Sequence, residues 1–193
     1  VDPRGEDFDI LAKHDTGIAQ APKTYLKSGM GLAPLHKYME YSIPFGLATD
    51  GAVSNNTLDI MEQMRLMALF GKYTKLDPTF LKLEDVLEIT FQGSAKVMHL
   101  AGKIGDLKPG MLADITLLRQ DGLNGTPKTN PLAYLVYCAR ATDVDTVLCN
   151  GKVLMQGRKL LTLDKKRIQQ EVQNRVERLS RRLPNERIAF YPA

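Results

Sequence analysis

The sequence is poor in the residues that mark disulfide-stabilised, secreted and membrane-spanning proteins. It contains no tryptophan and only two cysteines, Cys138 and Cys149, in 193 residues. Two cysteines in a chain of this length do not make a disulfide scaffold, so we expect a protein of the reducing cytoplasm. No signal peptide is evident, and no apolar run approaches the about 20 residues that a membrane-spanning helix needs. We therefore expect no membrane partner.

Histidine, the commonest metal ligand in proteins, is also scarce. The chain has three histidines, His14, His36 and His99, and no two of them are spaced to ligate one metal ion. His14 follows a predicted helix, where a histidine favours the negative end of the helix dipole. Surface, capping or packing roles therefore suit these histidines better than a shared metal site.

Basic charge is concentrated in one segment. The formal net charge is +4, and residues 164–187 contain eight Lys or Arg against four Asp or Glu. The rest of the chain is balanced at 18 against 18. Nucleic-acid binding favours a broader basic face with aromatic side chains on which bases can stack. We therefore expect no nucleic-acid partner.

The first hundred residues alternate between helical and extended patterns. Short apolar runs at 17–21 and 43–48 predict two buried strands, and Pro22 ends the first of them. Continuously apolar strands separated by helices are typical of a parallel sheet covered on both faces. Two strands cannot complete such a sheet, so we expect a piece of a larger α/β layer. Helices are predicted at 7–13, 32–41, 57–73 and 83–100, with Asn56 or Thr57 capping the third and a polar loop at 23–31.

After Gly105 the pattern becomes that of a small β unit. A strand is predicted at 113–118, and Asn150-Gly151 between two apolar runs is the strongest short hairpin signal. Asn130 and Pro131 suit the cap and first position of a helix at 130–139. A basic amphipathic helix is predicted at 164–183. We expect it to dock through an apolar stripe formed by Ile168, Val172, Leu179 and Leu183.

One carboxylate stands where an apolar run gives way to a turn. Asp50 follows the second predicted strand directly, and Ser54 lies four residues further on. At a strand end Asp50 could hold a divalent cation and accept a proton from bound water. It could equally be a turn residue, since Asp-Gly is a common turn pair. Ser54 likewise suits either the mouth of a site or a loop and cap.

The residues around Asp50 resemble a known superfamily. The matching segments read GLATDGAVSNNTLDI at 46–60 with EQMR at 62–65, GIAQAPKTYLK at 17–27, KIGDLKPGMLADI at 103–115 and VLCNGKV at 147–153. In order and spacing they resemble the amidohydrolase superfamily. Within it, the likeness is greatest to the methylthioadenosine and S-adenosylhomocysteine deaminases and the triazine hydrolases.

The resemblance implies a fold class and a division of the chain. It implies the C-terminal part of a (β/α)8 TIM barrel, part of a small composite β-sandwich and a C-terminal helix. We accordingly assign 1–102 to the last strands and helices of a metal-dependent barrel, and 103–160 to the small β domain. Residues 161–193 would form the amphipathic helix and tail.

The resemblance also implies a mononuclear metal site that this chain supplies only in part. Asp50 would be the eighth-strand ligand of one divalent ion, zinc or alternatively iron, and would take a proton from the attacking water. The other ligands of the family, a His-x-His pair on the first strand and a histidine on the fifth, are absent. Gln20 stands where many relatives carry histidine, and we expect Gln20 and Ser54 to contact substrate.

The predicted function is hydrolysis of a C–N bond in a small heterocyclic substrate, by deamination of an amino-purine nucleoside or related ring. The full-length protein is expected to be a homo-oligomer. One alternative is a triazine-type hydrolase that removes chloride or an alkylamine. A second alternative is a non-catalytic module, because the metal-ligand set in these residues is incomplete.

Overall fold

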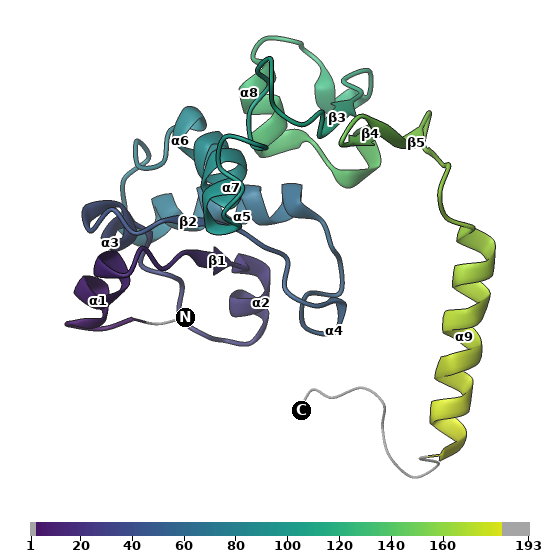
Figure 1. Ribbon diagram of the computed structural model, residues 1–193, viewed down its shortest axis with the longest axis horizontal. Coiled ribbons are helices and arrows are strands. Elements are labelled where there is room, and N and C mark those ends of the chain that lie inside the picture. Colours follow the sequence, from purple (N-terminus) through teal and green to yellow (C-terminus); the bar gives the residue numbers. More distant parts are fainter. Residues whose placement is uncertain (1–2, 183–193) are drawn as a thin grey trace.

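The computed structural model of the protein describes residues 3–182. These residues form a mixed α/β body around a two-stranded parallel sheet, a separate four-stranded antiparallel sheet, and a long helix that projects away from both (Figure 1). No helix in this described range is long and apolar enough to cross a membrane.

The parallel sheet pairs the two predicted strands. Strand β1 (Ile18–Gln20) lies beside β2 (Phe45–Leu47), with Ile18 opposite Phe45 and Gln20 opposite Leu47. Helix α1 (Asp7–Lys13) precedes the sheet, and α2 (Pro22–Lys27) and α3 (Leu35–Glu40) connect its strands. The predicted polar loop at 23–31 is wrong in its first part. Pro22 begins α2 instead, since a proline at the first helical position loses no hydrogen bond and has a preset φ.

The segment after β2 contains one helix more than predicted. A single turn, α4 (Ala52–Asn55), precedes the long helix α5 (Ile60–Lys75). Asp59, and neither Asn56 nor Thr57, caps α5. Its carboxylate accepts hydrogen bonds from the main-chain nitrogens of Met61 and Glu62, at 2.9 and 3.2 Å. Asn56 has a left-handed φ of 68°, which ends α4 and turns the chain towards the cap.

The predicted helix at 83–100 is a helical run with a π-helical centre. It comprises α6 (Leu83–Glu88), the π-helix η1 (Ile89–Gly93) and α7 (Ser94–Val97). Its last turn packs against the backbone of β2, where Ser94 Oγ accepts a 3.0 Å hydrogen bond from the nitrogen of Leu47. The approach requires a glycine at position 46, because a Cβ there would lie 2.5 Å from the Cα of Ser94.

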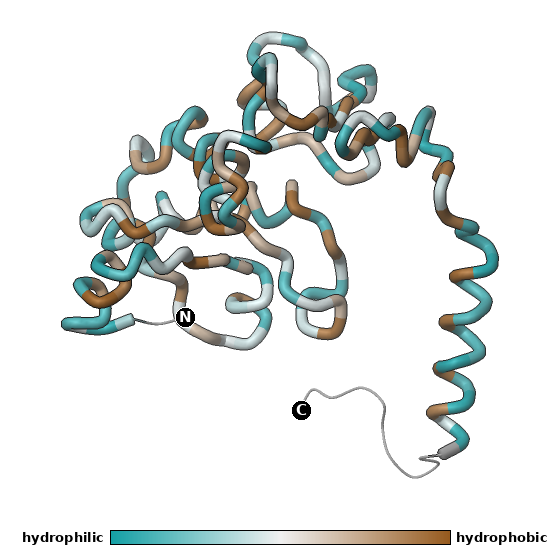
Figure 2. Tube along the Cα trace, viewed as in Figure 1, coloured by the Kyte–Doolittle hydropathy of each residue, from teal (hydrophilic) through white to brown (hydrophobic). Residues whose placement is uncertain are grey.

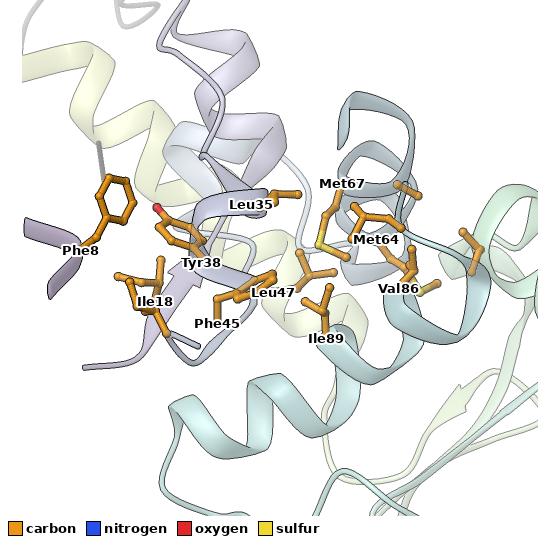
Figure 3. Close-up of a cluster of buried hydrophobic side chains, with 14 residues drawn as sticks. Phe8, Ile18, Leu35, Tyr38, Phe45, Leu47, Met64, Met67, Val86 and Ile89 are labelled. Carbon is orange, nitrogen blue, oxygen red and sulfur yellow. The ribbon is translucent and has the colours of Figure 1, made fainter. Parts of the chain in front are cut away.

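The main core lies between β2 and the helices. Figure 3 shows Tyr38, Phe45 and Leu47 facing Met64, Met67, Val86 and Ile89, which come from α5 and the α6–η1 run. The rings of Tyr38 and Phe45 are 5.6 Å apart and tilted. Aromatic and long apolar side chains contribute the most buried area per residue, so this cluster holds the parallel sheet in place.

The second sheet is antiparallel and has the strand order β3-β4-β5-β6. The hairpin at Asn150-Gly151 is confirmed, as is the cap at Asn130, whose side chain accepts from the nitrogens of Leu132 and Ala133.

Arg65 of α5 connects the body to this region by donating to the carbonyl oxygens of Tyr137, at 2.8 Å, and Ala139. The elements here are β3 (Ile115–Leu118), η2 (Leu123–Gly125), α8 (Pro131–Ala133), the π-helix η3 (Tyr134–Cys138), η4 (Ala141–Asp143), β4 (Val144–Cys149), β5 (Lys152–Gln156) and β6 (Lys159–Leu160).

The terminal helix α9 (Lys165–Arg182) forms as predicted but does not dock on the described body. Figure 2 shows apolar positions recurring along one side of a mostly hydrophilic helix. Those side chains are exposed, with Ile168 at 44%, Val172 at 55%, Val176 at 42% and Leu179 at 51%. The prediction of docking is therefore wrong within residues 3–182. Leu183, which was assigned to the same stripe, lies outside the described residues.

Candidate active site at the end of the parallel sheet

Asp50 lies three residues beyond β2, at the end of the sheet where α2 begins after β1. Its φ of 59° is left-handed, a conformation that aspartate tolerates better than most residues do. Its side chain is exposed. The strand end therefore presents this carboxylate to solvent and does not bury it beneath the helices.

Both oxygens of the Asp50 carboxylate accept hydrogen bonds from the turn that follows. Ser54 Oγ donates to Oδ2 at 2.8 Å, and the nitrogen of Gly51 donates to Oδ1 at 2.7 Å. These bonds favour the charged form, so Ser54 first, then Gly51, with a smaller contribution from Thr24, lower the pKa of the Asp50 carboxyl. Asp50 is thus a fixed, ionised carboxylate at neutral pH.

A buried amide holds the base of this turn. Asn55 is 0% exposed, and its Nδ2 donates to the carbonyl oxygen of Thr49 at 2.5 Å. Thr57 Oγ1 lies 3.2 Å from Asn55 Oδ1 and 2.8 Å from Glu62 Oε2. Asn55 therefore connects the residue before Asp50 to the start of α5.

Two lysines of α2 tie the end of β1 to the same turn. Lys23 Nζ contacts Glu62 Oε2 at 2.7 Å and Thr57 Oγ1 at 2.9 Å. Lys27 Nζ donates to the carbonyl oxygen of Ser54 at 2.8 Å and to Asn56 Oδ1 at 2.5 Å. Because they are four residues apart, both lysines lie on one face of α2. The sequence pattern placed both lysines in a predicted polar loop and did not predict this bracing role or the role of Asn55.

Gln20 is placed differently from Asp50 and Ser54. It is 2% exposed and, with Tyr25, Leu35 and Met67, lines a cavity of about 20 Å³ among α2, α3 and α5. Its Nε2 has no hydrogen-bond partner, and no bond joins it to Asp50 or Ser54 in the described chain. The structure thus brings Asp50 and Ser54 together and leaves Gln20 apart. A substrate contact by Gln20 stays a prediction.

Comparison with known proteins shows the family to which the chain belongs. The family model described as "Amidohydrolase family" matches residues 1–154. The chain belongs to the amidohydrolase family. A 5-methylthioadenosine/S-adenosylhomocysteine deaminase of Desulforudis audaxviator is 40% identical over 177 residues, which cover 92% of this chain and 40% of that protein. A protein of the same description from Pyrococcus horikoshii is 36% identical over 84% of this chain and 38% of its own length.

Solved structures with a similar fold superpose on this amidohydrolase chain. An adenosine deaminase from Xanthomonas campestris with bound zinc superposes with a TM-score of 0.86, at 24% identity, over 91% of this chain and 40% of its own. The zinc complex of the atrazine chlorohydrolase from Arthrobacter aurescens superposes with a TM-score of 0.79, at 27% identity, over 89% and 38%. The chain spans about 40% of the length of the relatives it matches.

Within residues 3–182 the amidohydrolase chain contains one candidate ligand for a metal ion and not a whole site. Catalytic zinc sites use three protein ligands, mainly nitrogen, sulfur or carboxylate oxygen. Asp50 has the right chemistry, but no group of three His, Cys, Asp or Glu side chains in this range could hold an ion. His36 lies on α3 and not at the end of the sheet. Its partial burial, followed by the charges of Lys75 and Lys37, lowers the pKa of its imidazole. The residues therefore fit a metal in part, through Asp50 alone.

Proposed function

We propose that this chain provides the C-terminal part of a metal-dependent amidohydrolase that deaminates an amino-purine nucleoside or a related ring. The observation that carries the proposal is Asp50, an ionised carboxylate held at the end of a parallel strand by Ser54 and Gly51. The names of relatives at 40% and 36% identity support deamination. In the proposal, the TIM barrel is completed by the portion of the relatives that this chain does not span.

Asp50 is the residue of this chain that would hold the metal. A bound divalent ion supplies acidity to a water molecule, whose pKa it brings towards neutrality. The carboxylate of Asp50 would accept the proton that this water loses. The water oxygen would add to the ring carbon that bears the amino group, while an acid outside this chain protonates the ring nitrogen. The C–N bond would then break as the carbonyl forms: the amino group would leave as ammonia with the proton held by Asp50, and the second proton of the water would restore that acid. Ser54 and Gly51 keep the carboxylate oriented throughout.

The experiment uses the full-length protein that the gene encodes. Bound metal and ammonia release from 5′-methylthioadenosine and S-adenosylhomocysteine are measured for wild type and for Asp50→Asn, which tolerates the left-handed φ. We expect the rate constant to fall by about a hundredfold to ten-thousandfold, the usual contribution of a general base. Asp121→Asn, which removes an exposed carboxylate paired with Arg119, serves as the control. Undiminished ammonia release by Asp50→Asn and Asp50→Ala would exclude the role.

A second candidate function is release of chloride or an alkylamine from a triazine. The observation in its favour is the 27% identity and TM-score of 0.79 with an atrazine chlorohydrolase. Chloride, alkylamine and ammonia assays on a substrate panel distinguish the two reactions. If none of these products forms and no metal is bound, the non-catalytic module is favoured.

A further inference from the structure

A buried glutamine of α5 caps the start of helix α2. Gln63 is 0% exposed, and its Oε1 accepts a 3.0 Å hydrogen bond from the main-chain nitrogen of Lys23. Lys23 is the second residue of α2, and Ala21, at the N-cap position, has no oxygen in its side chain. The first main-chain N–H groups of a helix find no acceptor within it. Gln63 therefore provides from α5 the acceptor that the residue before α2 lacks.

The same turn of α2 is attached to α5 at a second point. The ammonium group of Lys23 lies 2.7 Å from Glu62 Oε2, and Glu62 directly precedes Gln63 in α5. Consecutive residues of α5 thus bind the side chain and the main chain of one residue of α2. Figure 1 shows α2 beside α4 and the start of α5. Two points of attachment fix the direction of the first turn of α2 as well as its position.

Two side chains of α2 reach from this turn towards Asp50. Thr24 and Lys27 are three residues apart and so lie on one face of the helix. Lys27 donates to the carbonyl oxygen of Ser54, whose hydroxyl bonds to Asp50. Thr24 is 7% exposed, and its hydroxyl makes no hydrogen bond of ordinary geometry with a described residue. It still lies close enough to the Asp50 carboxylate to lower its pKa.

The unused hydroxyl of Thr24 makes the exact position of α2 important. Hydrogen bonds at catalytic groups are often long in the free enzyme and shorten when substrate binds. A small movement of α2 therefore decides whether Thr24 bonds to the carboxylate of Asp50. The bond from Lys23 to Gln63 limits that movement.

Stability alone does not account for a glutamine at position 63. Its Nε2 is buried and has no hydrogen-bond partner among the residues that the structure describes. The penalty for a buried unsatisfied donor is at least as large as the net contribution of one hydrogen bond. Gln63 therefore adds little net stability through its bond to Lys23. A buried group of this kind requires an explanation, and the position of α2 provides one.

We propose that Gln63 is a positioning residue for Asp50, which it serves by fixing the first turn of α2 and, with it, Thr24 and Lys27. Gln63 acts through α2 and not by contact with the substrate. The inference rests on the proposed function for the reaction that Asp50 serves. The positioning itself rests on the contacts of Gln63, Lys23 and Lys27.

The test uses the full-length protein and two substitutions of Gln63. Gln63→Met removes the acceptor and keeps the length and helix propensity of the side chain. Gln63→Glu retains an oxygen acceptor and is the conservative variant. Gln170→Met makes the same change at an exposed position of α9 and is the matched control. Circular dichroism verifies that each variant is folded.

Two main-chain amides report the positioning without any assay of activity. Exchange of the Lys23 amide hydrogen reports the bond to Gln63. Exchange at Gly51, whose nitrogen donates to Asp50 Oδ1 at 2.7 Å, reports how the carboxylate is held. We expect Gln63→Met to accelerate exchange at both amides and Gln63→Glu to restore protection at Gly51. A merely structural glutamine would change exchange at Lys23 and leave Gly51 unaltered.

Ammonia release from 5′-methylthioadenosine gives a second measure of the same effect. We expect kcat of Gln63→Met to fall by about tenfold to a hundredfold with KM nearly unchanged, because a misplacement of about 1 Å can cost a hundredfold in rate. Gln63→Glu should recover most of kcat, and Gln170→Met should equal wild type. Unchanged Gly51 exchange or unchanged kcat in Gln63→Met would overturn the proposal, as would failure of Gln63→Glu to restore them.

Thr24 supplies a second variant should Gln63→Met fail to fold. Thr24→Val keeps the shape of the side chain and removes the hydroxyl, whereas Thr24→Ser keeps the hydroxyl. We expect Thr24→Val to lower kcat with exchange at Lys23 unchanged, and Thr24→Ser to retain activity. Equal kcat in Thr24→Val and wild type would contradict the path through α2. If wild type releases no ammonia, the proposed function fails, and exchange at Gly51 still decides whether Gln63 positions Asp50.

Discussion

The ammonium group of Lys27 lies 2.8 Å from the main-chain carbonyl oxygen of Ser54, the residue whose hydroxyl bonds to Asp50. A lysine of the helix after β1 thus braces the turn after β2. Helix α2 and the turn after β2, which α3 and β2 separate in the sequence, are thereby held in one arrangement at the end of the sheet. The candidate carboxylate owes its orientation to contacts from both.

Lys27→Met removes this brace and keeps most of the apolar stem. We expect the free energy of unfolding to fall by about 1–2 kcal/mol, as for a lost hydrogen bond to a charged donor. The pKa of Asp50 should rise, because Ser54 is held less firmly against its carboxylate. Urea unfolding and a carbon-13 NMR titration of the carboxyl measure the two effects. Lys37→Met, which breaks an exposed pair with Glu40 and a cation–π contact with Tyr41, should leave the Asp50 titration unchanged.

Ser54→Ala removes the largest cause of the lowered pKa of Asp50. A depressed folded-state pKa stabilises the protein above the unfolded pKa, and this stability is lost as pH falls through the folded value. Wild type should therefore be more stable than Ser54→Ala at neutral pH, and the difference should shrink as Asp50 is protonated. Unfolding free energies measured across the acid range, with Asp50→Asn in both backgrounds, check this. A difference that does not shrink at low pH, or that is equally large in the Asp50→Asn background, would contradict the assignment.

Asn55→Ala should destabilise the turn more than any exposed substitution nearby. The change leaves the carbonyl oxygen of Thr49 without its donor and opens a small cavity at a fully buried position. We expect a loss of about 2–3 kcal/mol in the free energy of unfolding. Asn174→Ala, at an exposed position of α9, is the control for the change in residue type. Equal unfolding midpoints for the two variants would show that Asn55 does not hold the turn.

Local chemistry made much of the fold predictable. The two apolar strands, the Asn150-Gly151 hairpin and the cap at Asn130 each depend on neighbours in sequence, and all three form. The start of α5 was misplaced because Asp59, Asn56 and Thr57 are all good caps. The left-handed φ of Asn56 and the hydrogen bond from the nitrogen of Met61 to the side chain of Asp59 identify Asp59 as the cap. A capping motif predicts that a helix starts nearby more reliably than it predicts which residue is the cap.

Long-range relationships were not predictable from pattern. Position and chemistry singled out Asp50 and Ser54, but the bond from Lys27 joins residues 27 positions apart, whose proximity depends on strand pairing. The prediction that α9 docks on the described body was wrong for a related reason. An apolar stripe predicts that a helix has a partner, and it does not say that the partner lies within the same 193 residues. The divisions at 102/103 and 160/161 stay predictions, as does the contact of Gln20 with substrate.

The contact of α7 with β2 gives a last prediction, at Gly46. A Cβ at this position would lie 2.5 Å from the Cα and 2.6 Å from the nitrogen of Ser94, both main-chain atoms that cannot rotate away. Gly46→Ala must therefore shift α7 from the strand that leads to Asp50, and such overpacking costs about 1–3 kcal/mol. The shift also lengthens the bond from the nitrogen of Leu47 to Ser94, so hydrogen exchange at Leu47 should accelerate.

Gly122→Ala is the matched control, since a Cβ at Gly122 meets nothing within 4 Å and its φ of −81° suits alanine. It should leave both unfolding and the Leu47 amide unchanged. Because Gly46 lies four residues before Asp50, the test also reports whether α7 holds the strand that positions the carboxylate. If Gly46→Ala is as stable as Gly122→Ala and exchange at Leu47 is unaltered, the close packing of α7 on β2 does not exist in solution.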